Sequence, residues 1–393
     1  MEELIAERMR HVHESLIREI LKVVNDPRII SFAGGLPNPD LFPMAEIEEA
    51  CVQVLREDGK AALQYATTEG YPPLREYIAA RYRHTRGLEV DPAEILIVNG
   101  SQQGNDLMGK VFLNEGDGLL LERPSYLGAI QSYSVYRPTF LPVPLRDDGV
   151  DTEALADTLA TSRAKLFYGI PNFQNPTGIS YSAHNRAAVA EVLARHGTLY
   201  IEDDPYGELR FAGADMPSMR HYLGKQAVLL GSFSKIVSPG LRLGWICADR
   251  EYMKPLVIAK QATDLHTNYL AQRVVYQFLI NHDIDDHITR IRGIYKRQRD
   301  CMVQMIERYF PPEIAFTRPD GGMFLWLTLP DGTSAMELFH RCIEKGVAFV
   351  PGRPFYVDGG GDNELRLSYS TTDEATIEQG IRAMASAINE LFG

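Results

Sequence analysis

The strongest chemical signal in the sequence is the segment GSFSKIVSPGLRLGW at 231–245. Lys235 follows small residues at the end of an apolar run, and Arg242 stands seven positions later. Ser232, Ser234 and Arg242 can present hydroxyl groups and a planar cation to a phosphate. A lysine beside that phosphate could form an imine with a bound aldehyde. The alternative is a solvated lysine in a turn, but the flanking runs are too apolar for a surface excursion.

A second signal is the group of acidic residues in YIEDDPYGEL at 200–209. Burying carboxylates at the end of an apolar strand is costly without a cationic partner, and a protonated ring nitrogen is such a partner. A carboxylate there would keep the ring protonated, so that the ring could accept electrons. Asp203 lies three residues before Tyr206, so both could reach one ring. We expect at least one of Glu202, Asp203 and Asp204 to be a solvated loop charge.

Two weaker patterns complete the set of polar clusters. The segment GIPNFQNPTG at 169–178 predicts a tight turn, in which Asn175 could donate an N–H to an oxyanion. The segment NGSQQGNDL at 99–107 opens a predicted helix, whose first N–H groups could bind an anion. Taken alone, the first pattern predicts only a turn, and many helices begin like the second.

Short apolar runs predict the strands that position these clusters. The runs lie at 94–100, 118–124, 165–171, 198–204, 227–233 and 241–248. Helix-length amphipathic stretches such as 182–197 separate them, and this alternation indicates a mainly parallel sheet with helices on both faces. Ligands bind outside the carboxyl ends of such strands, and all four polar clusters come directly after an apolar run. The sequence therefore predicts one converging site.

The C-terminal part of the chain predicts a second, smaller α/β unit. A long helical stretch over roughly 251–308 precedes it. Strand-like runs then lie at 321–330, 346–355 and 364–371, with helices near 334–345 and at the C-terminus. At the other end, the turn-rich segment 30–43 joins an N-terminal helix to the main body.

Composition narrows the class of protein. The 393 residues are 45% apolar and 23% charged, which is enough for two or three packed domains. A net charge of −12 argues against nucleic acid or an anionic membrane as the main partner. The four cysteines are far apart and suggest neither a disulfide framework nor a metal site. The first 24 residues are charged at helical spacing, unlike a signal peptide or membrane anchor, so we expect a cytoplasmic protein.

The motifs together resemble, in order and spacing, the class I/II pyridoxal-phosphate-dependent aminotransferases of fold type I. These motifs are GSQQG, ERPSY, NPTG, EDDPY, SFSK with PGLRLGW, and LRLSYS. The opening SFAGGLPNPDLFP at 31–43 resembles the subgroup of 2-aminoadipate, kynurenine and multi-substrate aromatic aminotransferases, and the resemblance covers essentially the whole chain. One departure is Gln174, where the family usually has Asn before the residue matching Asn175.

The resemblance implies an α/β fold in three parts. A large cofactor-binding domain at 41–290 would contain a mainly parallel seven-stranded sheet flanked by helices. A smaller α/β domain would follow at 291–393, and an N-terminal helix and arm at 1–40 would pack with it. The active unit would be a homodimer with its active sites at the subunit interface.

The resemblance also implies a role for each motif residue. Lys235 would be the Schiff-base lysine and proton shuttle, Asp203 would pair with the pyridine nitrogen, and Tyr206 and Asn175 would bind the phenolic oxygen. The cofactor set also includes a stacking aromatic and phosphate-binding residues: Tyr126, Ser101, Gln102, Ser232, Ser234, Arg242 and Tyr65, the last reaching the phosphate of the other subunit. Arg366 would grip the substrate α-carboxylate, and the substrate set is completed by Asn175, Gly35 and Arg18.

The implied activity is transfer of an amino group from an α-amino acid to a 2-oxo acid such as 2-oxoglutarate. Arg18, with Ser15 on the N-terminal stretch, would favour an acidic side chain when it lies over the site and admit aromatic or branched ones when it swings away. We therefore expect a broad range that includes 2-aminoadipate. A lyase, decarboxylase or synthase of the same fold remains an alternative, as does a sensor that binds pyridoxal phosphate in a transcription regulator. The regulator would need a basic DNA-binding domain, whereas only about thirty residues precede SFAGG.

Overall fold

The computed structural model describes residues 4–10, 26 and 28–392. Within these residues the central sheet has eight strands in the order β2-β9-β8-β7-β6-β3-β4-β5. In that order they are Ile95–Val98, Gly244–Cys247, Ala227–Ser232, Leu199–Asp203, Ala164–Gly169, Gly118–Arg123, Thr139–Arg146 and Gly149–Val150. The five strands from β8 to β4 run parallel, whereas β9 is antiparallel to both neighbours and β5 is antiparallel to β4.

The predicted mainly parallel sheet is confirmed, and all six predicted runs form strands of it. The sheet has eight strands in the described chain rather than the expected seven. Neither β4 nor β5 was among the predicted runs. Strand β4 contains Pro142 and Pro144, which lower the strand signal, and β5 has only two residues.

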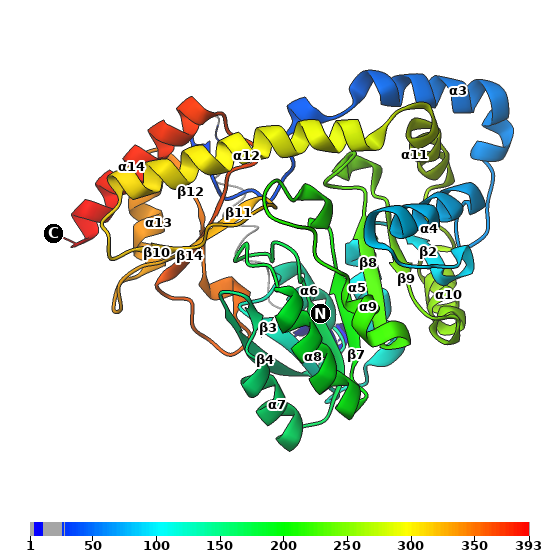
Figure 1. Ribbon diagram of the computed structural model, residues 1–393, viewed down its shortest axis with the longest axis horizontal. Coiled ribbons are helices and arrows are strands. Elements are labelled where there is room, and N and C mark those ends of the chain that lie inside the picture. The colour runs from blue at the N-terminus through cyan, green and yellow to red at the C-terminus, as the bar shows by residue number, and fades with distance from the viewer. Residues whose placement is uncertain (1–3, 11–25, 27, 393) are drawn as a thin grey trace.

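Helices pack against the sheet: α8 Ala183–His196 contacts β5, and α9 Met219–Leu223 contacts β8 (Figure 1). Before the long C-terminal helices, the α-helices are α1 Glu7–Arg10, α3 Met44–Ala62, α4 Pro72–Arg86, α5 Ser101–Phe112, α6 Leu127–Ser134, α7 Thr152–Thr161, α8 Ala183–His196 and α9 Met219–Leu223. Helix α8 matches the stretch predicted at 182–197, because Ser182 caps its first turn and Gly197 ends it at φ 67°.

The stretch expected to be helical over 251–308 is three helices, α10 Arg250–Asp264, α11 Tyr269–Asn281 and α12 Ile284–Tyr309. The first break falls at Leu265, which has a φ of 68°, and Asn268 caps the next helix. Asp283 caps the third. The breaks change the chain direction, so that α11 packs on α3 while α12 runs on to α14.

The C-terminal part forms a four-stranded antiparallel sheet in the order β10-β11-β14-β13. Its elements are β10 Ala315–Phe316, β11 Phe324–Thr328, α13 Ala335–Glu344, β13 Val350–Pro351, β14 Glu364–Ser368 and α14 Glu374–Phe392. Strand β1 Ile30–Ser31, in the N-terminal arm, pairs with β12 Val347–Ala348 of this part. Helix α12 extends from the large sheet's side of the molecule to α14, and the predicted boundary at 290 falls inside it (Figure 1).

No helix in the described part of the chain is long and apolar enough to cross a membrane. The large sheet instead carries the core. Strands β2, β8 and β9 are buried along their whole length, which is typical of strands covered on both faces. The loops that follow the carboxyl ends of the parallel strands lie at one edge of this buried layer.

Candidate active site

The polar clusters predicted after four apolar runs converge at one edge of the sheet. Strands β2, β6, β7 and β8 run in the same direction, so their carboxyl ends meet there. The side chains that follow them surround a cavity of about 350 Å³. Of the predicted site residues, twelve line this cavity: Gly35, Ser101, Gln102, Tyr126, Asn175, Asp203, Tyr206, Ser232, Ser234, Lys235, Arg242 and Arg366.

Lys235 follows β8 and directs its amine into this cavity. Its Nζ donates a hydrogen bond to the Gly35 carbonyl at 2.9 Å. Burial, together with the charges of Arg366 and Arg242, lowers the pKa of the Lys235 amine to about 8. Roughly one-tenth of the amine is therefore neutral at pH 7, far more than for an ordinary lysine, and the neutral form is what a nucleophile or a general base requires.

Asp203, the last residue of β7, lines the same cavity and is 1% exposed. Its Oδ2 accepts hydrogen bonds from the Tyr168 hydroxyl at 2.8 Å and the Asn105 amide at 3.5 Å. Its Oδ1 is buried and has no partner among the described residues. Burial raises the pKa of this carboxyl to about 6. A buried carboxylate oxygen without a partner is suited to an N–H donor that enters the cavity.

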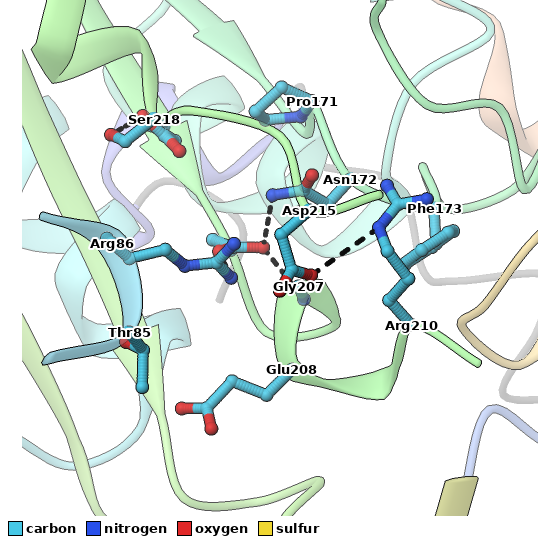
Figure 2. A network of polar contacts seen from close by, with 12 residues as sticks. Thr85, Arg86, Pro171, Asn172, Phe173, Gly207, Glu208, Arg210, Asp215 and Ser218 are labelled. Atoms are coloured by element: carbon cyan, nitrogen blue, oxygen red, sulfur yellow. Dashed lines mark hydrogen bonds and ion pairs between the residues drawn. The ribbon is translucent and has the colours of Figure 1, made fainter. Parts of the chain in front are cut away.

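The neighbouring carboxylates point away from the cavity, and the expectation that at least one of the three is solvated is wrong. Glu202 is buried and accepts hydrogen bonds from the Ser218 hydroxyl and the Met219 N–H. Asp204 pairs with Arg86 at 3.0 Å, and the Asn172 amide and the Gly207 N–H also donate to it. Figure 2 shows Arg86, Asn172 and Gly207 gathered in this network. These contacts hold the loop that carries Tyr206.

Asn175 links the other polar groups of the cavity. Its Nδ2 donates to the Tyr206 hydroxyl at 3.4 Å, and its Oδ1 accepts from Arg366 Nη1 at 2.8 Å. Burial raises the pKa of the Tyr206 hydroxyl above its usual range, so this group is an O–H donor at neutral pH. The amide therefore connects a hydroxyl donor with a fixed cation.

Arg366 is 5% exposed, and no carboxylate pairs with it in the described residues. Its guanidinium carbon lies 4.4 Å from the centre of the Phe324 ring and 5.3 Å from that of Phe355. Nη2 donates to the Ala33 carbonyl, whereas Nε is buried without a partner. Burial lowers the pKa of this guanidinium to about 10. A buried arginine held by rings and carbonyl oxygens is poised to bind an incoming carboxylate.

The opposite end of the cavity is suited to an anion. Helix α5 begins there at Ser101, and its N-cap Gly100 has a φ of 76°. A Cβ atom at Gly100 would lie 2.5 Å from Arg242 Nη2, so a glycine is required. Arg242 donates to the carbonyls of Pro239 and Asn99 and has no carboxylate partner in the described chain. The helix start, the serines and this cation form a cradle whose N–H groups, hydroxyl groups and positive charge suit a phosphate.

One predicted site residue among those that the structure describes does not line the cavity. Tyr65 is 78% exposed and makes an edge contact with the His266 ring, with centroids 5.9 Å apart. Arg18 and Ser15 lie outside the described residues. Conversely, the sequence patterns did not indicate several apolar residues of the wall: Leu127, Ile170, Pro205, Pro239 and Phe355. Tyr168 and Asn105, which hold Asp203, were also missed, although both lie within motifs already singled out.

These groups fit pyridoxal phosphate. The free Asp203 oxygen matches a protonated ring nitrogen, and the Lys235 amine matches the aldehyde. The cradle around Arg242 and the α5 N-terminus matches the phosphate, and Tyr206 with Asn175 matches the phenolic oxygen. No described residue that lines the cavity conflicts with pyridoxal phosphate bound in this way.

Comparisons with known proteins agree with the geometry. The family described as aminotransferase class I and II matches residues 33–384. A 2-aminoadipate transaminase of Thermus thermophilus is 45% identical over 386 residues, covering 97% of this chain and 95% of the relative. An aromatic-amino-acid aminotransferase of Thermococcus litoralis is 37% identical, covering 99% and 95%.

A solved structure gives the same result. The α-aminoadipate aminotransferase of Thermus thermophilus, complexed with N-(5′-phosphopyridoxyl)-L-leucine, superposes with a TM-score of 0.93 at 44% identity, covering 100% of this chain and 98% of the other. Its bound group joins pyridoxal phosphate chemistry to an amino acid. The present chain belongs to the class I and II aminotransferases, and it is an enzyme that uses pyridoxal phosphate to transfer amino groups between amino acids and 2-oxo acids.

Proposed function

We propose that the chain transfers the amino group of 2-aminoadipate, aromatic and branched or aliphatic amino acids to 2-oxoglutarate, with Lys235 as the cofactor-bearing amine. The observation that carries this proposal is the placement of Lys235 and the unpartnered Asp203 oxygen on one cavity. Bound pyridoxal phosphate supplies an aldehyde that condenses with amines and a protonated ring that withdraws electrons.

Lys235 and Asp203 divide the proton work between them. The Lys235 amine, once released, accepts the Cα proton of the substrate as general base, since its pKa of about 8 leaves part of it neutral. Asp203 holds a proton on the ring nitrogen through its free oxygen. Tyr206 and Asn175 would donate to the phenolic oxygen of the ring, Ser101, Gln102, Ser232, Ser234 and Arg242 would hold the phosphate, and Tyr126 would contact the ring.

Arg366 orients the substrate. Its planar guanidinium can bind the α-carboxylate with two parallel hydrogen bonds, and Asn175 and Gly35 lie beside it. Because the Phe324 and Phe355 rings fix this cation, the carboxylate has one orientation, and the Cα–H bond of the substrate is presented to Lys235.

The proposed breadth rests on the cavity wall and on the relatives. Leu127, Ile170 and Phe355 offer apolar surface, while Gln131 offers a polar group. The relatives named above act on 2-aminoadipate and on aromatic amino acids. Replacing Arg18 by Ala should lower the turnover of 2-aminoadipate relative to that of phenylalanine. An unchanged ratio would contradict a role for Arg18 in selecting the side chain.

A cytoplasmic homodimer is part of the proposal. Tyr65 lies on the surface, and exposed apolar side chains gather along and after α3: Met44, Val52, Leu55 and Leu63. If Tyr65 completes the site of the other subunit, Lys235→Ala and Tyr65→Ala proteins are each impaired. Mixed under conditions that exchange subunits, they should regain activity, because one site of each hybrid has both residues. Sedimentation as a monomer, or no recovery on mixing, would contradict this arrangement.

The test of the main proposal is the absorption spectrum of the purified enzyme with its cofactor. We expect a visible band that 2-aminoadipate or an aromatic amino acid bleaches and 2-oxoglutarate restores. The Lys235→Ala variant should lack the visible band, and its turnover should be at least about 100-fold lower. The exposed Lys254, replaced by Ala, serves as the matched control and should behave as the wild type. A band that forms but is never bleached would contradict transamination in favour of a lyase or a sensor.

A further inference from the structure

Glu122, the fifth residue of β3, is fully buried and does not line the active-site cavity. No cationic side chain pairs with it in the described chain. Its carboxylate instead accepts three hydrogen bonds, from the Ile170 N–H at 2.9 Å, the Tyr181 hydroxyl, and Gln174 Nε2 at 2.9 Å. A buried carboxyl is costly, and here the cost is offset only by neutral donors.

Gln174 uses its whole side-chain amide to join two segments. Its Nε2 donates to Glu122 and also to the Pro124 carbonyl at 2.9 Å. Its Oε1 accepts from the N–H and the hydroxyl of Thr177, at 2.9 and 2.7 Å. One end therefore holds the segment that leads to Tyr126, and the other holds the NPTG turn.

The NPTG turn carries Asn175, whose two amide atoms face Tyr206 and Arg366. A small rotation of the turn would move both contacts together. Among the described residues Arg366 has no carboxylate partner to hold it, and Asn175 is one of its polar restraints there. The chain of contacts runs from Glu122 through Gln174 to the group that orients the substrate carboxylate.

We propose that Glu122 and Gln174 are a positioning pair that locks the NPTG turn and thereby sets the orientation of Asn175 and Arg366 for substrate binding. The proposal rests on the proposed function, which assigns Arg366 to the substrate carboxylate. Neither residue of the pair touches the cofactor cavity, so both act through Asn175.

The polarity of these hydrogen bonds makes the pair testable. Every atom that faces the Glu122 carboxylate carries a proton, so a glutamine at 122 would set one NH₂ group against another. Turning the Gln174 amide over would set its oxygen against the Pro124 carbonyl. A glutamate at 174 would instead place two carboxylates together. Exchanging the two residues restores a donor facing an acceptor between positions 122 and 174, but it sets a carboxylate oxygen at 174 against the Pro124 carbonyl.

The experiment compares Glu122→Gln, Gln174→Glu and the double exchange as holoenzymes. Glutarate, a dicarboxylate without an amino group, serves as the probe, and its dissociation constant is read from the cofactor absorption band. We expect each single variant to weaken glutarate binding about 10-fold, with KM raised more than kcat is lowered. The double exchange should recover part of the lost affinity, so that it binds glutarate more tightly than either single variant. A merely structural role would not produce this recovery.

Wild-type glutarate affinity in both single variants, or a double exchange no better than the singles, would overturn the proposal. If the single variants fail to fold, Thr177→Val carries the test, because it removes the hydroxyl contact to Gln174 and keeps the shape of the side chain, although the Ile179 N–H also loses its hydroxyl acceptor. It should weaken glutarate binding about 3-fold, and no change would overturn the proposal. Bleaching of the wild type by amino acids is measured alongside, and its absence would contradict the proposed function instead.

Discussion

Asp203 and Glu122 are two buried carboxyl groups in one sheet, on strands β7 and β3 that are separated by β6. Burial raises the pKa of both, to about 6 and about 7. They differ in their partners, since both oxygens of Glu122 accept hydrogen bonds whereas Asp203 Oδ1 has none. Because the two groups are equally buried, the oxygen without a partner indicates that Asp203 binds a ligand, whereas the hydrogen-bonded oxygens of Glu122 indicate a structural role.

The largest expected effect separates the two groups by chemistry. Asp203→Asn should lower kcat by about 10²–10³-fold, because the ring nitrogen loses its charged partner. The unfolding free energy of its apoprotein should not fall, because the amide oxygen can still accept from Tyr168. Single-turnover absorption and urea unfolding measure the two quantities. Equal kcat losses for Asp203→Asn and Glu122→Gln would break the comparison.

A second prediction extends the comparison to the cations. Arg86 is balanced by Asp204, whereas Arg366 is held by rings and neutral oxygens and is free to bind an anion. Arg366→Lys should lower kcat/KM by about 10- to 100-fold through KM, since a lysine cannot make two parallel bonds. Steady-state kinetics with 2-aminoadipate measures this. Arg382→Lys, in an exposed pair with Glu378, is the matched control and should change nothing.

The smallest expected effect is the pH dependence of stability. The folded-state pKa values of Asp203 and Glu122 lie above the ordinary values of 3.8 and 4.5. Between its ordinary and its folded-state pKa, each group binds more protons in the folded protein than in the unfolded chain. The contributions of these two carboxyl groups to the unfolding free energy of the apoprotein should therefore fall as the pH rises from about 4 to about 7. The Asp203→Asn variant should lack the decrease in unfolding free energy that ends near pH 6. The Glu122→Gln variant should lack the decrease that ends near pH 7.

Cofactor provides the control for this pH dependence. A ring N–H favours the ionised form of Asp203, so bound cofactor should remove the pH-dependent decrease in unfolding free energy that Asp203 causes. The decrease that Glu122 causes should remain. Chemical unfolding of apo- and holoenzyme across this pH range measures both. A cofactor effect on both decreases alike would contradict the distinction between the two carboxyl groups.

Much of the site could be predicted because its residues lie directly after buried strands. Lys235 and Asp203 each follow a run of apolar residues, and the alternation of strands and helices places such positions at one edge. The strand pattern did not decide which of Glu202, Asp203 and Asp204 faces the cavity. In the structure, alternate side chains at the end of β7 point to opposite sides, so only Asp203 reaches it.

The sequence by itself therefore determined the mainly parallel sheet, and it predicted the reactive lysine and the phosphate-binding residues, because each of their motifs occupies a short stretch of chain. Tertiary structure alone decided the place of the proline-containing strand β4, the three-helix course of 251–308 and the neutral shell of Glu122. The Asn175–Arg366 contact likewise joins residues 191 positions apart. Such contacts depend on how distant elements pack, and hydrophobic periodicity along a chain carries no record of that packing.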